Sequence, residues 1–181
     1  MTPIEIGGLR PVNHDFGIVE ALPTQNLAPG CTCTFKAATG IYWKLVYTGE
    51  TTYPWAKIGG PPLRFVDPEG RSCESTTNLS TGVPSMTAPL AMEALFTFGA
   101  SYIQNSSGEL NEALLVLLIN GVESEFARWT SSSTFALTAE MVDSVQAIAK
   151  GQVATLRYRG TSAKKLVFNR NQFKVDPLRV G

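Results

Sequence analysis

Residue types that perform acid–base or nucleophilic chemistry are few and poorly spaced along these 181 residues. The only histidine, His14, is followed directly by Asp15, but a triad carboxylate must reach the far ring nitrogen of its histidine. Close pairs of glutamates, at positions 109 and 112 and at 123 and 125, are compatible with a glycosidase, but such spacings are common on solvated strand edges. We therefore expect the chain not to be an enzyme, with glycan hydrolysis as the weakest alternative.

Metal-ligating and phosphate-binding patterns are equally sparse. The three cysteines, Cys31, Cys33 and Cys73, stand at unrelated spacings and do not form a zinc-binding pattern with His14. An odd number of cysteines does not make a disulfide framework, and spacing two would place the first two on one face of a strand. The Gly-Gly pairs lack the spacing of a phosphate-binding loop. We expect free thiols, no metal, no cofactor, and synthesis in a host cytoplasm.

Composition favours a turn-rich protein that assembles with others. Charged residues make up 17% of the chain, which contains 16 glycines and 11 prolines, and the net charge is zero. Residues 150–181 hold eight basic residues and one acidic residue, so the two ends of neighbouring subunits could attract each other, or the charges could cancel between adjacent strands. The longest apolar run, residues 113–119, is too short to span a membrane. We expect neither membrane insertion nor direct nucleic-acid binding.

The elements that must position these residues are short strands bounded by glycine and proline. The apolar run at residues 113–119 is interpreted as a strand buried on both faces, because Asn120-Gly121 directly after it is a strong hairpin signal. Asp67-Pro68-Glu69-Gly70 predicts a turn, and residues 72–81 an exposed loop. Residues 138–143 favour a short helical turn. The sequence predicts an all-β antiparallel β-sandwich, most consistent with a jelly roll, at residues 28–181, preceded by an extended attachment arm at residues 1–27.

Two stretches stand out as candidate structural or interface elements. The first contains Trp43, Tyr53 and Trp55 and ends in the corner formed by Gly59, Gly60, Pro61 and Pro62. Its tryptophans suit a core or a subunit interface, or, if exposed, a platform for stacking sugars. The second is Phe168-Asn169-Arg170, where a basic residue follows an aromatic one. Such alternation indicates a strand with apolar residues inward, or a nucleic-acid contact.

Several of these motifs together resemble a β-rich module of tailed-bacteriophage virion proteins of the minor tail, fibre or head-decoration type. The resemblance covers about residues 22–180. Its matching residues are Leu22-Pro23, Gly30, Trp43, Tyr47, Tyr53-Pro54-Trp55-Ala56-Lys57-Ile58-Gly59-Gly60-Pro61-Pro62-Leu63, Met86-Thr87-Ala88-Pro89-Leu90-Ala91, Gly151, Leu156-Arg157-Tyr158-Arg159, Phe168-Asn169-Arg170 and Asp176-Pro177-Leu178-Arg179-Val180. The chain departs from the module at Pro54, where the module has lysine, and at Met92-Glu93-Ala94, where it often has Gly-Asp-Tyr.

The resemblance implies a structural component of a virion, commonly a jelly-roll-like homotrimer that contacts other virion proteins. It does not distinguish a tail or fibre protein from a capsid-decoration protein. A carbohydrate-binding or receptor-binding head that recognises a host-surface glycan is the alternative in a different functional class.

Overall fold

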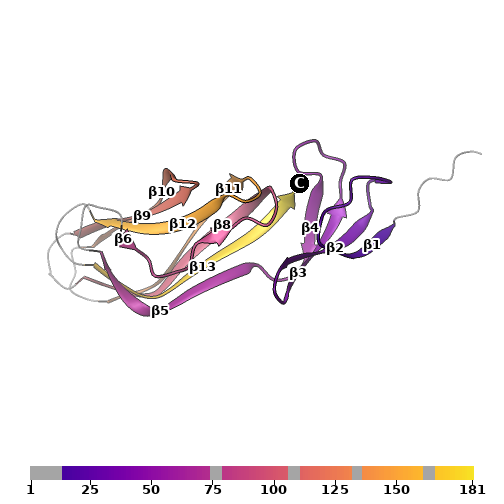
Figure 1. Cartoon of the computed structure of the whole chain (residues 1–181). Helices are drawn as coiled ribbons and strands as arrows, with labels where there is room; N and C mark the ends of the chain where they lie inside the picture. Colours follow the sequence, from indigo (N-terminus) through magenta and orange to yellow (C-terminus); the bar gives the residue numbers. More distant parts are fainter. Residues whose placement is uncertain (1–13, 74–78, 106–110, 132–135, 161–165) are drawn as a thin grey trace, which may run out of the picture. The chain divides into compact units, whose positions relative to one another are not determined.

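The computed structural model of the chain describes residues 14–73, 79–105, 111–131, 136–160 and 166–181, which form strands and no helix (Figure 1). The expected all-β fold is confirmed. The chain divides into two compact units, which are described separately: unit 1 is Met1–Pro61 with Arg179–Gly181, and unit 2 is Pro62–Leu178. No helix among the described residues is long and apolar enough to cross a membrane.

Unit 1 is a small sheet whose strands follow one another in chain order. Its strands are β1 (Asp15–Val19), β2 (Thr32–Ala38), β3 (Ile41–Tyr47) and β4 (Trp55–Gly59), and the end of β13 (Leu166–Val180) pairs with β4. The β1–β2 pair is parallel, whereas β2, β3 and β4 form an antiparallel meander. One face of this sheet is a core of residues exposed by 3% or less: Cys31, Cys33, Phe35, Trp43, Leu45, Trp55 and Val180.

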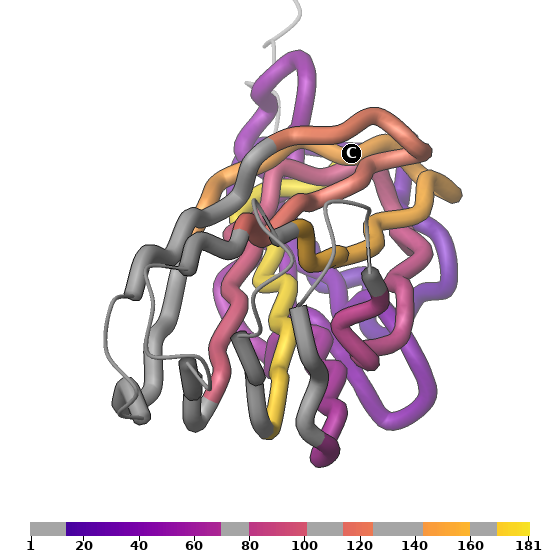
Figure 2. The backbone as a smooth tube through the Cα atoms, turned by 90° about the vertical axis from the view of Figure 1, so that its left-hand side faces the viewer, coloured from indigo at the N-terminus to yellow at the C-terminus, as the bar shows by residue number. Residues whose placement is uncertain are grey.

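Unit 2 is the β-sandwich. Its strands are β5 (Leu63–Cys73), β6 (Leu79–Ser80), β7 (Met86–Thr87), β8 (Met92–Asn105), β9 (Asn111–Ile119), β10 (Val122–Ser131), β11 (Ala136–Ile148), β12 (Val153–Gly160) and most of β13. One sheet has the order β5-β13-β8-β11, and the other has the order β10-β9-β12-β6 with β7 beside β12 (Figure 2).

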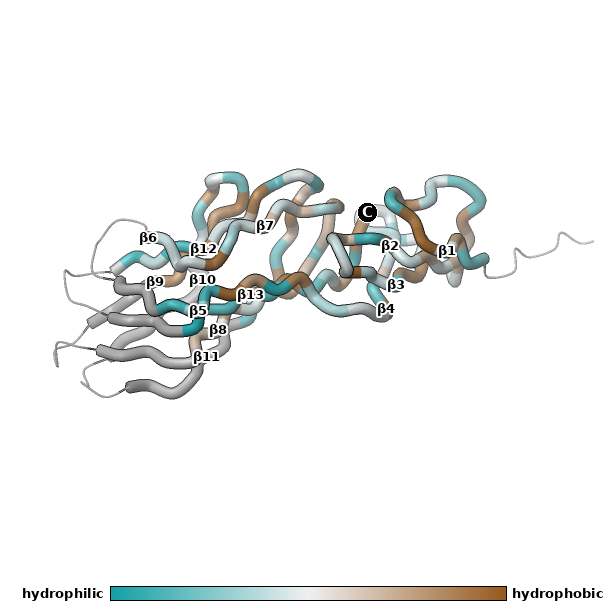
Figure 3. The backbone as a smooth tube through the Cα atoms, turned by 60° about the horizontal axis from the view of Figure 1, so that its bottom comes forward, coloured by the Kyte–Doolittle hydropathy of each residue, from teal (hydrophilic) through white to brown (hydrophobic). Residues whose placement is uncertain are grey.

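The two sheets of unit 2 meet through a packed interior. Across the two sheets, the rings of Phe98 on β8 and Tyr158 on β12 are edge-to-face with centroids 6.0 Å apart. Within the first sheet, Phe96 on β8 packs on Phe173 of the neighbouring β13 with centroids 5.8 Å apart. All four side chains are exposed by 1% or less. Buried residues alternate with half-buried ones along the described parts of β8, β12 and β13, which directs one face of each sheet inward. Figure 3 shows the hydropathy of the same strands. The β-sandwich prediction is therefore confirmed.

The hairpin that was predicted after the apolar run is confirmed. Strand β9 pairs with β10 through Ile119 and Val122, so that Asn120 and Gly121 alone form the connection. Their φ angles are +50° and +84°, which is the two-residue turn with positive φ at both positions that Asn-Gly favours. Within β9, Leu115, Val116 and Leu117 are all buried, as expected for a strand covered on both faces.

Three local predictions are wrong because strand pairing overrides a local turn or helix signal. Residues 138–143 are not helical but lie inside β11, which pairs with β8 along its length. The expected turn at Asp67-Pro68-Glu69-Gly70 is part of β5, which pairs with β13 on both sides of that segment. The exposed loop expected at residues 72–81 begins inside β5, contains β6 and ends at Thr81, which is fully buried. Residues 74–78 of that loop lie outside the described residues.

The domain boundary that was expected after residue 27 does not coincide with a boundary of either unit. Residues 15–19 of the expected arm form β1, which pairs with β2 and belongs to unit 1. Residues 1–13 lie outside the described residues, so an attachment role for them stays a prediction.

Candidate functional site

The two tryptophans of the aromatic segment form the interior of unit 1. Trp43 on β3 and Trp55 on β4 are exposed by 0% and 1%. The Trp43 Nε1–H donates to the Pro61 carbonyl oxygen at 2.9 Å, which satisfies the polar atom of the indole, and the Trp55 ring meets Tyr47 edge-to-face at 5.3 Å. Side chains buried to this degree cannot stack on a sugar. Tyr53 is half-buried just before β4.

The corner after β4 depends on one glycine. Gly60 has φ +96°, and a Cβ atom built on it would lie 2.1 Å from the Tyr42 carbonyl oxygen and 3.1 Å from the Trp43 Cα. The atoms in the way are backbone atoms, so no side-chain rotation relieves the clash. Gly59, the register partner of Lys44, has more room, with its nearest neighbour at 3.6 Å. Pro61 then presents its carbonyl to Trp43, and Pro62 begins unit 2.

Arg170 lies opposite a β-bulge in β5, where Pro68 and Glu69 together face this one residue of β13. The register with β5 shifts between Asn169 and Asn171, and Arg170 between them has φ +52°. A positive φ is uncommon for a long side chain. Arg170 is exposed, whereas its neighbour Asn171 is 0% exposed and faces the interior of the sandwich in alternation with Phe173 and Val175.

Asn171 is the centre of a buried polar cluster that the sequence analysis did not identify. Its Oδ1 accepts a hydrogen bond from the Tyr158 hydroxyl at 2.9 Å, and its Nδ2 donates to the Thr81 carbonyl oxygen at 2.9 Å. The Thr81 hydroxyl in turn donates to the Leu156 carbonyl oxygen at 3.1 Å. Asp67, exposed by 5%, is the register partner of Asn171. Because buried polar groups are costly unless paired, this cluster specifies one arrangement of β12, β13 and the segment after β6.

One side of the sandwich consists of two long edge strands. Among the described strands β10 pairs only with β9 and β11 only with β8, although they have 10 and 13 residues. Both carry large exposed apolar side chains, Val122 at 74% and Val145 at 50%. A hollow of about 310 Å³, lined by residues that include Val122, Gln146 and Ala147, lies between the two strands. We call the surface formed by β10 and β11, including Val122 and Val145, the β10–β11 side.

The cysteines of unit 1 are buried thiols. Cys31 and Cys33 lie on one face, as expected, and both are free. Burial, together with the negative charge of Asp15, raises the pKa of Cys33 from 9.0 to about 11, which keeps this thiol protonated and poorly nucleophilic. No group of three or more potential metal ligands occurs among the described residues.

Comparison with known proteins gives weak similarity in structure and none in sequence. No protein-family model matches the chain, and no curated protein matches it. Similar solved structures include the Eiger TNF of S. frugiperda, at 10% identity and a TM-score of 0.41, covering 67% of this chain and 96% of that one. The CBM22-1 xylan-binding domain of Paenibacillus barcinonensis Xyn10C has 11% identity and a TM-score of 0.36, covering 81% and 86%.

A third similar structure is the VP2 subviral particle of infectious bursal disease virus, at 11% identity and a TM-score of 0.32. The match covers 76% of this chain and 42% of the viral chain. Similarity at these scores carries no inference about function, and the β-sandwich assignment follows from the strand pairing itself.

Proposed function

We propose that the chain is a non-enzymatic structural component of a tailed-phage virion, either tail- or fibre-associated or capsid-decorating. It assembles through the sandwich of unit 2, as a homotrimer, and attaches through its N-terminal arm. The observation that carries this proposal is the β10–β11 side. Natural proteins shorten, block or cover long edge strands, because unpaired backbone groups there recruit other chains. Two such strands that also expose Val122 and Val145 suit coverage by neighbouring subunits.

The residues that carry the sequence resemblance support the same proposal. Trp43, Trp55 and Gly60 are core and corner residues of unit 1. Their burial excludes Trp43 and Trp55 as a platform for stacking sugars and is consistent with a scaffold role for this segment.

The oligomeric state tests the assembly surface. We expect the purified chain at about 10 μM to elute as a trimer in size-exclusion chromatography with multi-angle light scattering. Val122→Glu and Val145→Glu place a charge on the β10–β11 side and should give monomers. The control Ile58→Glu changes a residue of unit 1 that is 54% exposed and should leave the trimer intact. A monomeric wild-type chain, or a trimer unaffected by both valine substitutions, contradicts the proposal.

The arm is tested separately by deletion of residues 1–13, which spares β1 and therefore the sheet of unit 1. We expect the shortened chain to trimerise but not to join particles during infection. Normal incorporation would show that residues 1–13 of the predicted arm are not the anchor. The copy number of the chain in purified particles then distinguishes the two placements, since hundreds of copies indicate decoration and a few dozen or fewer indicate the tail.

A further inference from the structure

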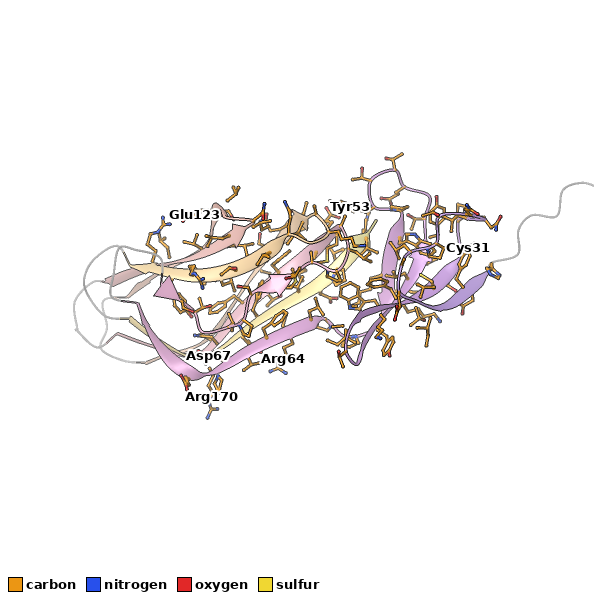
Figure 4. The ribbon with its side chains drawn as sticks, viewed as in Figure 1. Cys31, Tyr53, Arg64, Asp67, Glu123 and Arg170 are labelled. Carbon is orange, nitrogen blue, oxygen red and sulfur yellow. The ribbon has the colours of Figure 1, made fainter. Side chains whose placement is uncertain are left out.

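A cationic hollow of about 270 Å³ lies on the outer face of β5 and β13, away from the β10–β11 side. Its lining residues are Arg64, Val66, Pro68, Arg170 and Gln172. Arg64 and Arg170 extend from the same side of the two strands (Figure 4). Arg64 Nη2 donates to the neutral Gln172 Oε1 at 3.3 Å, and Arg170 makes no ion pair or side-chain hydrogen bond with another described residue.

No acidic residue occurs among the described residues that line the hollow. The nearest acidic residues along β5 are Asp67 and Glu69, and neither lines the hollow. Asp67 is 5% exposed and belongs to the inner face of the strand. Lys174, the register partner of Arg64, is half-exposed on the same outer face and adds a further cation. A hollow whose described lining has two guanidinium groups and no carboxylate favours a ligand that brings negatively charged oxygens.

The fold holds Arg170 in place through its neighbour. Asn171 is fixed on the inner face by its hydrogen bonds with Tyr158 and Thr81, so the preceding residue, Arg170, is held on the outer face by the alternation of the strand. Arg170 keeps φ +52°, at a position where glycine or asparagine would be favoured by backbone conformation alone. The backbone that carries the guanidinium group is therefore already ordered before any ligand arrives, which lowers the entropic cost of binding.

We propose that this hollow binds an anionic sugar, with carboxylate or phosphate oxygens held between Arg64 and Arg170. The Gln172 amide can donate to a sugar hydroxyl, and the apolar surfaces of Val66, which is 46% exposed, and Pro68 suit the C–H face of a sugar ring. The volume lies just below the range of about 300–1,000 Å³ that is typical of pockets for drug-sized ligands, so it fits one sugar residue better than an extended acidic peptide. This inference is independent of the proposed virion role.

The test is an NMR titration of the arginine side-chain resonances of the full chain at low ionic strength. The probes are sodium glucuronate, glucose 6-phosphate, glucose, inorganic phosphate and a hexaglutamate peptide. The variants are Arg170→Gly and Arg64→Gln, with Lys150→Gln as a control that removes one positive charge from an exposed turn of unit 2. Arg170→Gly suits the positive φ and should not lower the melting temperature, which separates loss of binding from loss of folding.

We expect glucuronate and glucose 6-phosphate to bind the wild type and glucose not to bind. Arg170→Gly and Arg64→Gln should each raise the dissociation constant by about tenfold or more, because each removes one charge-assisted hydrogen bond. Lys150→Gln should leave the dissociation constant unchanged. Binding should weaken as salt is added. The proposal would be overturned if the sugar anions do not bind, or if they bind Arg170→Gly as tightly as the wild type. It would also be overturned if inorganic phosphate or hexaglutamate binds as tightly as the sugar anions.

Discussion

Replacing Gly60 by alanine should destabilise unit 1 far more than a glycine-to-alanine change normally does. The new Cβ would lie 2.1 Å from the Tyr42 carbonyl oxygen, and real Cβ contacts essentially never fall below 3.0 Å, so β3 or the corner has to move by about 0.9 Å. That movement displaces Trp43, whose indole is buried and bonded to Pro61. The positive φ costs roughly 1–2 kcal/mol, and the displaced hydrogen bond and packing bring the total to about 3–5 kcal/mol.

Gly40→Ala is the matched control. Gly40 also has a positive φ, +74°, and also belongs to unit 1, but a Cβ there meets nothing within 4 Å. The two variants share the conformational strain and the effect of alanine on the unfolded chain. The difference between their free energies of unfolding therefore isolates the clash. We expect Gly40→Ala to cost roughly 1 kcal/mol.

Urea unfolding followed by tryptophan fluorescence measures this difference. In a Trp129→Phe background the two remaining tryptophans both belong to unit 1, so the signal reports that unit. With an m-value of about 2 kcal/mol/M, the Gly60 variant should unfold at a urea concentration about 1–2 M below that of the Gly40 variant. Equal midpoints for the two variants would refute the argument that the close approach to Tyr42 requires glycine.

Two further predictions concern buried polar groups. Asn171→Ala removes the hydrogen bonds to Tyr158 and Thr81 and should lower the free energy of unfolding of unit 2 by about 2–4 kcal/mol in chemical denaturation. The control Gln172→Ala should lower it by about 0.5 kcal/mol. Similar losses for the two variants would contradict a structural role for the cluster. The pKa of Cys33 is raised in the folded state, so its contribution to stability is fully present below about pH 9 and is lost as the pH rises toward 11. Wild type should therefore lose up to about 2 kcal/mol more than Cys33→Ala between pH 9 and 10.5 in chemical denaturation, and identical pH profiles would contradict this.

The sequence was sufficient to predict the structure where a local turn signal and the strand pairing agree. Asn120-Gly121 specifies a turn that needs positive φ at two positions, and the strands on either side of it pair in the corresponding register. The aromatic segment was also predictable as a core element, because large apolar side chains that alternate along a strand have to be covered. That Gly60 in particular is required could not be predicted, since this depends on how closely the corner approaches Tyr42.

Sequence reasoning failed where long-range pairing decides the outcome. Asp67-Pro68-Glu69-Gly70 has turn chemistry, yet β13 pairs on both sides of it and keeps it in a strand. The division into two units was likewise not predictable, because unit 1 is completed by residues 179–181, whose pairing with β4 joins segments more than 100 residues apart. The cluster around Asn171 brings together three segments whose polar residues give no signal in the sequence, because serine, threonine and asparagine are common in loops.

Neighbouring residues of β13 place a buried polar group and an exposed cation on opposite faces of the sandwich. Asn171, Phe173 and Val175 alternate inward and are all buried, so Arg170 faces outward. The extra residue of the adjoining bulge lies in β5, where Pro68 and Glu69 face Arg170. Arg170 has φ +52°, and the hydrogen bonds of Asn171 help to offset the cost of that conformation. Glycine would suit this backbone better, and the exposed guanidinium group contributes nothing to the core, so we attribute the arginine to the binding role proposed for the hollow.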